Sequence, residues 1–135
     1  MATENVGAIV SKVAETNVTN MRFVKVGTKS DMVSRTTVNT ERSCGVVAMI
    51  SAGFKGTVIA PGDAVPVCES GTVIMEAGGA IADGAEVMSD GSGRPVTFVA
   101  GGGALALGVA TNGATAGAAG DEIAIRLYAL SEQHT

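Results

Sequence analysis

Apolar residues alternate with polar or small residues along much of the chain after residue 43. In EIAIRLY (122–128), every second residue is a large aliphatic one, so Ile123, Ile125 and Leu127 would share one face of a strand. In ALALGVA (104–110), large residues alternate with alanine and glycine, which suits a strand that is closely approached on one side. A period of two residues is typical of β-strands. It predicts strands in both segments and at 44–50, 57–60, 64–68, 72–76, 85–88 and 94–99.

Turn-forming residues separate these predicted strands at short intervals. Ser-Asp-Gly-Ser-Gly (89–93) lies between two of them and predicts a hairpin. The pattern Gly-x-x-(Val/Ile) begins at Gly62, Gly84 and Gly120, each time just before a predicted strand. A true internal repeat or a shared type of turn would each produce this pattern. Many short strands separated by turns predict an all-β fold, either a small Gly/Ala-rich barrel or a sandwich.

The first 43 residues differ from the rest in texture and in charge. They are rich in threonine, asparagine and valine and carry a net charge of +2, whereas residues 44–135 carry −6. We interpret residues 1–43 as an extended N-terminal arm with one or two strands, and residues 44–135 as a compact β domain. The predicted boundary therefore lies near Ser43.

Composition and charge exclude several classes of function. The chain has 19 glycines and only four aromatic residues in 135, so its core must consist of aliphatic side chains. A net charge of −4 without tryptophan argues against nucleic-acid binding, which needs a basic surface or aromatic stacking platforms. Residues 95–120 carry no charge, but their many glycines and polar groups could not form a lipid-exposed helix. We therefore expect neither a nucleic-acid partner nor a membrane partner.

The residue types that usually carry catalysis or bind metals are sparse. His134, the only histidine, lies one residue from the C-terminus, where chains usually fray, so we interpret it as an exposed tail residue. Cys44 and Cys68 form no CxxC motif; we favour two buried thiols, although a disulfide remains an alternative. GGGALALG (101–108) lacks the Lys-Ser/Thr of a phosphate-binding loop. We expect a protein that is not an enzyme and that has no metal or cofactor.

The order of motifs after residue 43 resembles that of a known group of proteins. The motifs are APGDAVPV (60–67), GGAIADGAEVMSDGSGRPVTF (78–98) and LGVATNGATAGAAGDEIAIRLY (107–128). Together they are similar to the capsid cement, or decoration, proteins of tailed bacteriophages. The resemblance implies a virion protein, made in the host cytoplasm, that binds the outer surface of the mature head. It also implies a homo-oligomer, a trimer more readily than a dimer, that stabilises the head by bridging subunits of the major capsid protein.

The composition of the arm suggests how such a protein would attach. An extended segment of valine and threonine can add a strand to an exposed sheet edge on a partner. The basic side chains of the arm are our candidates for capsid contacts: Arg22, Lys25, Lys29, Arg35 and Arg42.

Two other classes of protein remain as alternatives. A biotinyl- or lipoyl-type carrier domain shares the Gly-x-x-Val turns, but it needs a lysine at a hairpin tip, and Lys55 is the only lysine after residue 43. A bacterial surface or adhesion module would need export, and no export signal is visible in the sequence.

Overall fold

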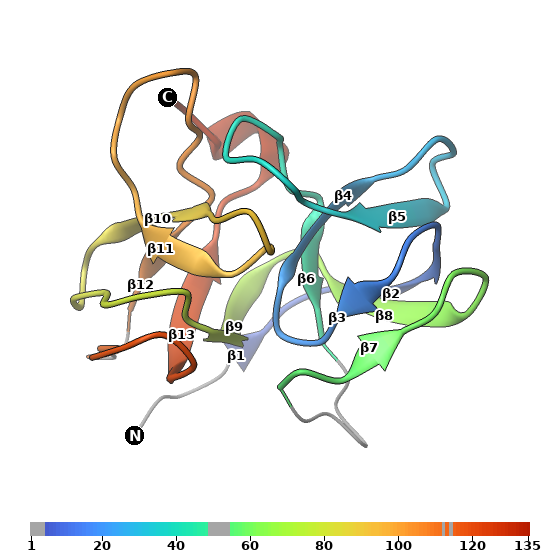
Figure 1. Ribbon diagram of the computed structural model, residues 1–135, viewed down its shortest axis with the longest axis horizontal. Coiled ribbons are helices and arrows are strands. Elements are labelled where there is room, and N and C mark those ends of the chain that lie inside the picture. Colours follow the sequence, from blue (N-terminus) through green and yellow to red (C-terminus); the bar gives the residue numbers. More distant parts are fainter. Residues whose placement is uncertain (1–4, 49–54, 112, 114) are drawn as a thin grey trace.

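The computed structural model describes residues 5–48, 55–111, 113 and 115–135, and β-strands dominate this part of the chain (Figure 1). The one helical element among the described residues is a short 3₁₀ turn, Leu130–Glu132. The prediction of an all-β fold is therefore confirmed. The strands are β1 (Asn5–Val6), β2 (Ile9–Ala14), β3 (Val18–Thr19), β4 (Phe23–Val26), β5 (Met32–Arg35), β6 (Gly45–Val47), β7 (Val58–Ile59), β8 (Ala64–Cys68), β9 (Gly71–Glu76), β10 (Glu86–Ser89), β11 (Pro95–Thr97), β12 (Gly108–Ala110) and β13 (Glu122–Leu127).

Five strands form a closed barrel in the order β2-β5-β4-β6-β8. The pairing of β2 with β5 is parallel, and the other pairings are antiparallel. Valines at alternate positions fill the interior, because every second side chain of a barrel strand points inward. This barrel core consists of Ala14, Val18, Val24, Val33, Val47, Ile59, Val65 and Val67.

The remaining strands form a second sheet and a small ribbon. The sheet has six strands in the order β1-β9-β13-β12-β10-β11, and β3 and β7 pair as a two-stranded ribbon. Ile123 and Ile125 of β13 are fully buried in the larger core of the molecule, as their alternation predicts. In β12, a side-chain carbon on Gly108 would lie 2.7 Å from the carbonyl oxygen of Arg126. The close approach predicted for this segment is therefore confirmed at Gly108.

The three Gly-x-x-(Val/Ile) motifs form the same turn. Gly62, Gly84 and Gly120 have φ angles of 91°, 81° and 92°, a region that favours glycine. In each turn, the N–H after the glycine donates to the carbonyl two residues before it, at 3.1–3.3 Å. Strands β8, β10 and β13 each begin two residues after the glycine. A shared turn type is therefore sufficient to explain the recurring motif.

The predicted boundary at Ser43 is wrong, because the first 43 residues supply β2, β4 and β5, three of the five barrel strands. Ser43 itself is buried. The threonine, asparagine and charged residues suggested an arm, but Val18, Val24 and Val33 among them point into the barrel core. The change in net charge near Ser43 therefore does not mark a domain boundary, because strands on both sides of Ser43 form one barrel.

The described chain begins and ends at opposite edges of the molecule. In Figure 1, β1 lies at the lower edge, and the C-terminal segment lies at the upper edge, beside the loops that follow β5 and β11. No helix in the described part of the chain is long and apolar enough to cross a membrane.

Candidate functional site

Three of the five predicted contact residues are already engaged within the protein. Arg22, on the segment before β4, donates from Nε and Nη2 to Oε1 of Glu76, at 3.2 and 3.0 Å. Its Nη1 also donates to the carbonyl of Ser92, at 3.4 Å. Arg42 donates from Nη1 to the carbonyls of Leu130 and Gln133, at 3.0 and 3.4 Å. These two guanidinium groups therefore connect distant segments of the fold.

Lys25 of β4 pairs with the carboxylate of Glu41. Burial alone would raise the pKa of Glu41, but Lys25 and the N–H groups of Thr37 and Val38 together lower it below its ordinary value. Glu41 is thus held as an anion that fixes the loop after β5. Lys25 has an internal role that the sequence did not reveal.

Lys29, Arg35 and Arg42 are the exposed cations of the candidate set, and the side chains of Lys29 and Arg35 bond to no other described residue. Lys29 lies in the turn between β4 and β5, and Arg35 is the last residue of β5. Arg35 and Arg22 line one pocket of about 250 Å³. The structure therefore brings together two of the five candidates at this pocket.

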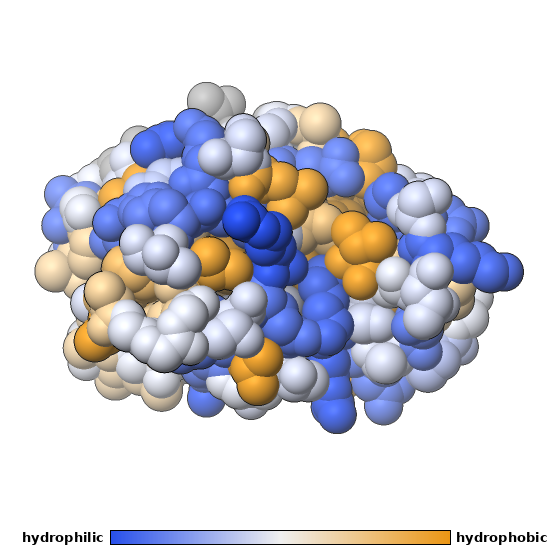
Figure 2. All heavy atoms as spheres, turned by 90° about the horizontal axis from the view of Figure 1, so that it is seen from above, coloured by the Kyte–Doolittle hydropathy of each residue, from blue (hydrophilic) through white to orange (hydrophobic). Residues whose placement is uncertain are grey.

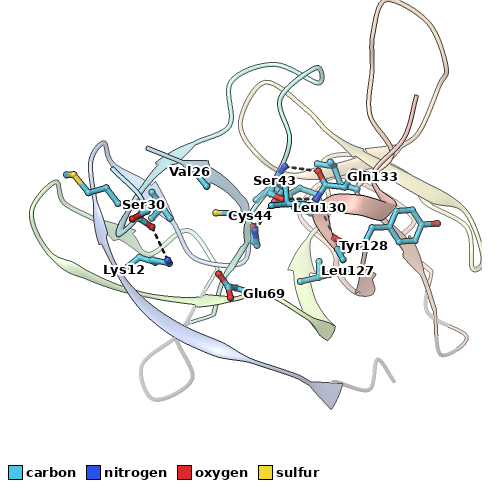
Figure 3. A pocket seen from close by; sticks show the side chains of 16 residues that line it. Lys12, Val26, Ser30, Ser43, Cys44, Glu69, Leu127, Tyr128, Leu130 and Gln133 are labelled. Carbon is cyan, nitrogen blue, oxygen red and sulfur yellow. Dashed lines mark hydrogen bonds between the residues drawn. The ribbon is translucent and has the colours of Figure 1, made fainter. Parts of the chain in front are cut away.

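A second cavity, of about 260 Å³, lies between the barrel and the six-stranded sheet (Figure 3). Lys12, Cys44 and Glu69 lie on its barrel side, and Leu127 and Leu130 lie on the side of the sheet and C-terminal segment. Burial and the nearby Glu69 carboxylate raise the pKa of the Cys44 thiol to about 11. The cavity is mainly apolar. The raised pKa keeps the Cys44 thiol protonated and therefore a poor nucleophile. We interpret the cavity as a packing gap between the barrel and the six-stranded sheet.

Cys44 and Cys68 do not form a disulfide with each other. The Cys44 thiol donates to the carbonyl of Val24 at 3.6 Å, and the Cys68 thiol donates to the carbonyl of Ser70 at 3.0 Å. Within the described residues, no three His, Cys, Asp or Glu side chains are grouped so that they could hold a metal ion.

Gln133 connects the C-terminal segment to the barrel (Figure 3). Its amide oxygen accepts from the N–H of Ser43 at 3.1 Å, and its amide nitrogen donates to the carbonyl of Ser43 at 2.7 Å. Both bonds are buried. The two ends of this contact lie 90 residues apart, which is why the sequence alone did not reveal it.

We expect Gln133→Ala to lower the free energy of unfolding by about 1–3 kcal/mol, because it leaves two buried backbone groups of Ser43 without their partner. Urea unfolding followed by circular dichroism measures this loss. Ser131→Ala, at an exposed neighbouring position, is the matched control and should change stability by less than about 0.5 kcal/mol. An equal effect of both substitutions would contradict the role of the Ser43 contact.

His134 is exposed, as predicted, but it is held in place. Its carbonyl accepts from the N–H of Ala106 at 2.7 Å, and its ring stacks on Tyr128, with centroids 5.8 Å apart. Its Nε2 lies 3.1 Å from Oε2 of Glu86, which also accepts from the hydroxyl of Tyr128 at 2.8 Å. The interpretation of His134 as a fraying tail residue is therefore wrong, because these contacts anchor it to the second sheet.

We expect the imidazole pKa of His134 to lie above 6.5, because the Glu132 carbonyl and the Glu86 carboxylate both favour the protonated ring. A raised pKa means that the stabilising contribution is complete below pH 6.5 and is lost as the pH rises through the folded-state value. An NMR titration of the single histidine measures this pKa directly. Glu86→Gln should lower it, whereas an unchanged pKa in that variant would contradict the pairing.

Strand addition by residues 1–43 is not available within the barrel. Each of β2, β4 and β5 pairs on both sides, so none of them offers a free edge. Strand addition through β2, β4 and β5 is therefore excluded by their pairing, whereas β1 lies at the edge of the six-stranded sheet.

Exposed aliphatic side chains mark further places for contact. Val58 and Val99 are 57% and 66% exposed, and Val38 and Leu130 about half exposed. Seen from above, the molecule shows apolar side chains in separate patches divided by a hydrophilic strip (Figure 2). The loops after β5 and β11, which carry Val38 and Val99, lie at this upper edge in Figure 1. Mixed apolar and charged patches of this kind suit protein–protein contacts.

The described residues thus form an all-β protein in which a closed barrel lies beside a second sheet. The family model for phage cement proteins matches residues 4–127. The chain therefore belongs to the phage cement protein family, which associates it with the bacteriophage head and confirms the resemblance noted in the sequence.

Comparison with solved structures supports the same fold. The N base of the head fiber protein gp8.5 of bacteriophage phi29 is similar, with a TM-score of 0.64 and 15% sequence identity. The match covers 90% of this chain and 93% of the chain of that N base. At this identity the likeness shows the fold alone. No curated protein matches the chain.

Proposed function

We propose that this protein is a capsid decoration protein that binds the outer surface of the mature head and stabilises it by bridging subunits of the major capsid protein. The observation that carries the proposal is the match to the phage cement protein family over residues 4–127. Membership of this family favours a capsid role over the carrier domain and the surface module.

The charged surface supports attachment through side chains. Lys29 and Arg35 are exposed and unengaged, so they are the first candidates for capsid contacts. Arg22, Lys25 and Arg42 have internal partners and would contribute mainly by shaping the surface. Exposed ion contacts weaken as salt screens them, so binding through these cations should depend on ionic strength.

The exposed aliphatic side chains support self-association. Val58 and Val99 would gain from burial against a second copy or against the capsid. We propose a homo-oligomer, a trimer more readily than a dimer. Several weak contacts in one oligomer then act together at a high effective concentration, so that modest individual contacts are sufficient.

The test is co-sedimentation of the purified protein with mature and with immature capsids, together with light scattering of the free protein. We expect binding to mature capsids, a rise in the temperature at which they disrupt, and an oligomer at micromolar concentration. Absence of binding to any capsid would contradict the proposed function. A monomer that still bound would contradict the oligomer alone.

A further inference from the structure

We propose that the pocket lined by Arg22 and Arg35 binds the carboxylate of an acidic side chain on the partner protein, with Arg35 as its anchor. We name it the Arg35 pocket. The identification of this partner as the major capsid protein rests on the proposed function. The chemistry of the pocket stands on its own residues.

Several separate parts of the fold meet at the Arg35 pocket. Arg35 comes from the end of β5, Asn17 and Thr19 come from the region of β3, and Ser92 comes from the turn between β10 and β11. Val58 of β7, more than half exposed, adds an apolar wall. A carboxylate entering here would find polar groups on several sides and an aliphatic contact for its methylene groups.

The walls of the pocket are held in fixed positions. The β10–β11 turn packs against β4, where the N–H of Phe23 donates to the carbonyl of Gly93 at 2.8 Å. Gly93 has a φ of 83°, and a side-chain carbon there would lie 2.9 Å from the carbonyl oxygen of Phe23. On the other side, the N–H of Arg35 donates to Oγ1 of Thr16 at 3.1 Å. A pocket with anchored walls loses little freedom when a ligand binds.

The charges around the pocket leave one cation unbalanced. Glu76 is engaged by Arg22. Asp90, at the start of the β10–β11 turn, accepts from the N–H groups of Ser92 and Arg94 and from Nε of Arg94. The guanidinium of Arg35 has no such acidic partner among the described residues. The Arg35 pocket therefore carries a net positive charge, although the net charge of the whole chain is −4.

Hydrogen-bond donors complete the match to a carboxylate. The amide of Asn17 and the hydroxyls of Thr19 and Ser92 make no side-chain bonds to other described residues. An arginine fork binds a carboxylate through two parallel N–H bonds, and neighbouring donors take the remaining lone pairs. An acidic side chain is the protein group that uses all of these features.

The first experiment measures the chemistry without a capsid. The ¹⁵N-labelled protein is titrated with N-acetyl-glutamate methylamide, which carries one side-chain carboxylate, and with the neutral N-acetyl-glutamine methylamide. We expect saturable NMR shifts at Arg35 Nε–H and at the amides of Thr19 and Ser92 with the glutamate probe alone. Arg35→Ala should weaken this binding about tenfold or more, and Arg35→Lys should restore it only in part. Lys29→Ala, which removes an exposed cation outside the pocket, should leave it unchanged.

Equal shifts with both probes, or equal binding by the wild type and Arg35→Ala, would overturn the proposal. The second experiment measures occupancy of mature capsids by the same variants, at low and moderate salt. Lower occupancy by Arg35→Ala than by the wild-type protein supports the pocket as a capsid contact, and wild-type occupancy by Arg35→Ala overturns that role while the decoration function stands. Binding of the glutamate probe by a protein that binds no capsid would support the carboxylate site and contradict the proposed function.

Discussion

We expect a chain that lacks residues 1–43 to lose cooperative folding altogether. The deletion removes β2, β4 and β5 and leaves β6 and β8 as the only barrel strands. It also removes Ala14, Val18, Val24 and Val33, half of the barrel core, and Phe23 from the larger core. The two remaining strands would expose unpaired backbone groups and apolar side chains to water. Folded domains are stable by only about 5–15 kcal/mol, so the loss of three barrel strands and half of the barrel core should leave no folded state.

Calorimetry and near-ultraviolet circular dichroism measure this outcome. The truncated chain should show no cooperative heat absorption and no fixed tertiary signal. A chain that begins at Asn5 is the matched control, because it keeps every described strand and should unfold cooperatively. A cooperative transition in the chain that begins at Cys44 would show that residues 44–135 hold a core of their own.

We expect the point substitution Gly45→Ala to lower the free energy of unfolding by roughly 2–6 kcal/mol, a large loss for one residue. Gly45 begins β6, where that strand pairs with β4 and β8 within the barrel. A side-chain carbon there would lie 2.4 Å from the carbonyl oxygen of Cys68 and 2.7 Å from Cγ1 of Val67. Since the nearest atom belongs to the backbone of β8, the barrel itself would have to open slightly. The φ of 156° adds conformational strain.

Gly79→Ala is the control for this substitution, because nothing lies within 4 Å of the added carbon and its φ is not positive. It should change the free energy of unfolding by less than about 1 kcal/mol. Urea unfolding of both variants gives the comparison. Similar stability of the two variants would mean that β6 and β8 adapt to a side chain at their closest approach.

The strands after residue 43 could be predicted because local pattern determines them. Each segment predicted there contains an observed strand, and Ile123 and Ile125 of β13 are buried as predicted, with the small Ala124 between them buried on the other face. Glycine turns such as the one at Gly62 mark where the strands begin. These signals are contained in a few consecutive residues, so no knowledge of distant contacts was needed.

The role of the first 43 residues could not be predicted from the same signals. Val24 and Val33 are the barrel-facing residues of β4 and β5, but polar residues surround them in the sequence and give the segment the composition of an arm. The barrel closes only because β4 pairs with β6 and β2 pairs with β8, and both of those partner strands follow later in the chain. Long-range pairing of this kind leaves no local trace.

The candidate site shows the same limit. The sequence correctly presented Arg22 and Arg35 as cations, but it could not show that Arg22 reaches Glu76, 54 residues away, while Arg35 stays unengaged. Nor could it show that both line one pocket with Ser92. A cation that pairs with an acidic group inside the fold is not available to a binding partner. Which cations are paired in this way depends on distances between residues far apart in the sequence.

The opposite positions of β1 and the C-terminal segment have a practical consequence for protein engineering (Figure 1). A peptide fused after Thr135 and a peptide fused ahead of Asn5 would project from different edges of the same molecule. On a decorated particle, the face that rests on the shell would shield one of these peptides and display the other to the medium. Antibody labelling of the two fusions would therefore report how the subunit is oriented, and the displayed end would be the one suited to carrying an epitope.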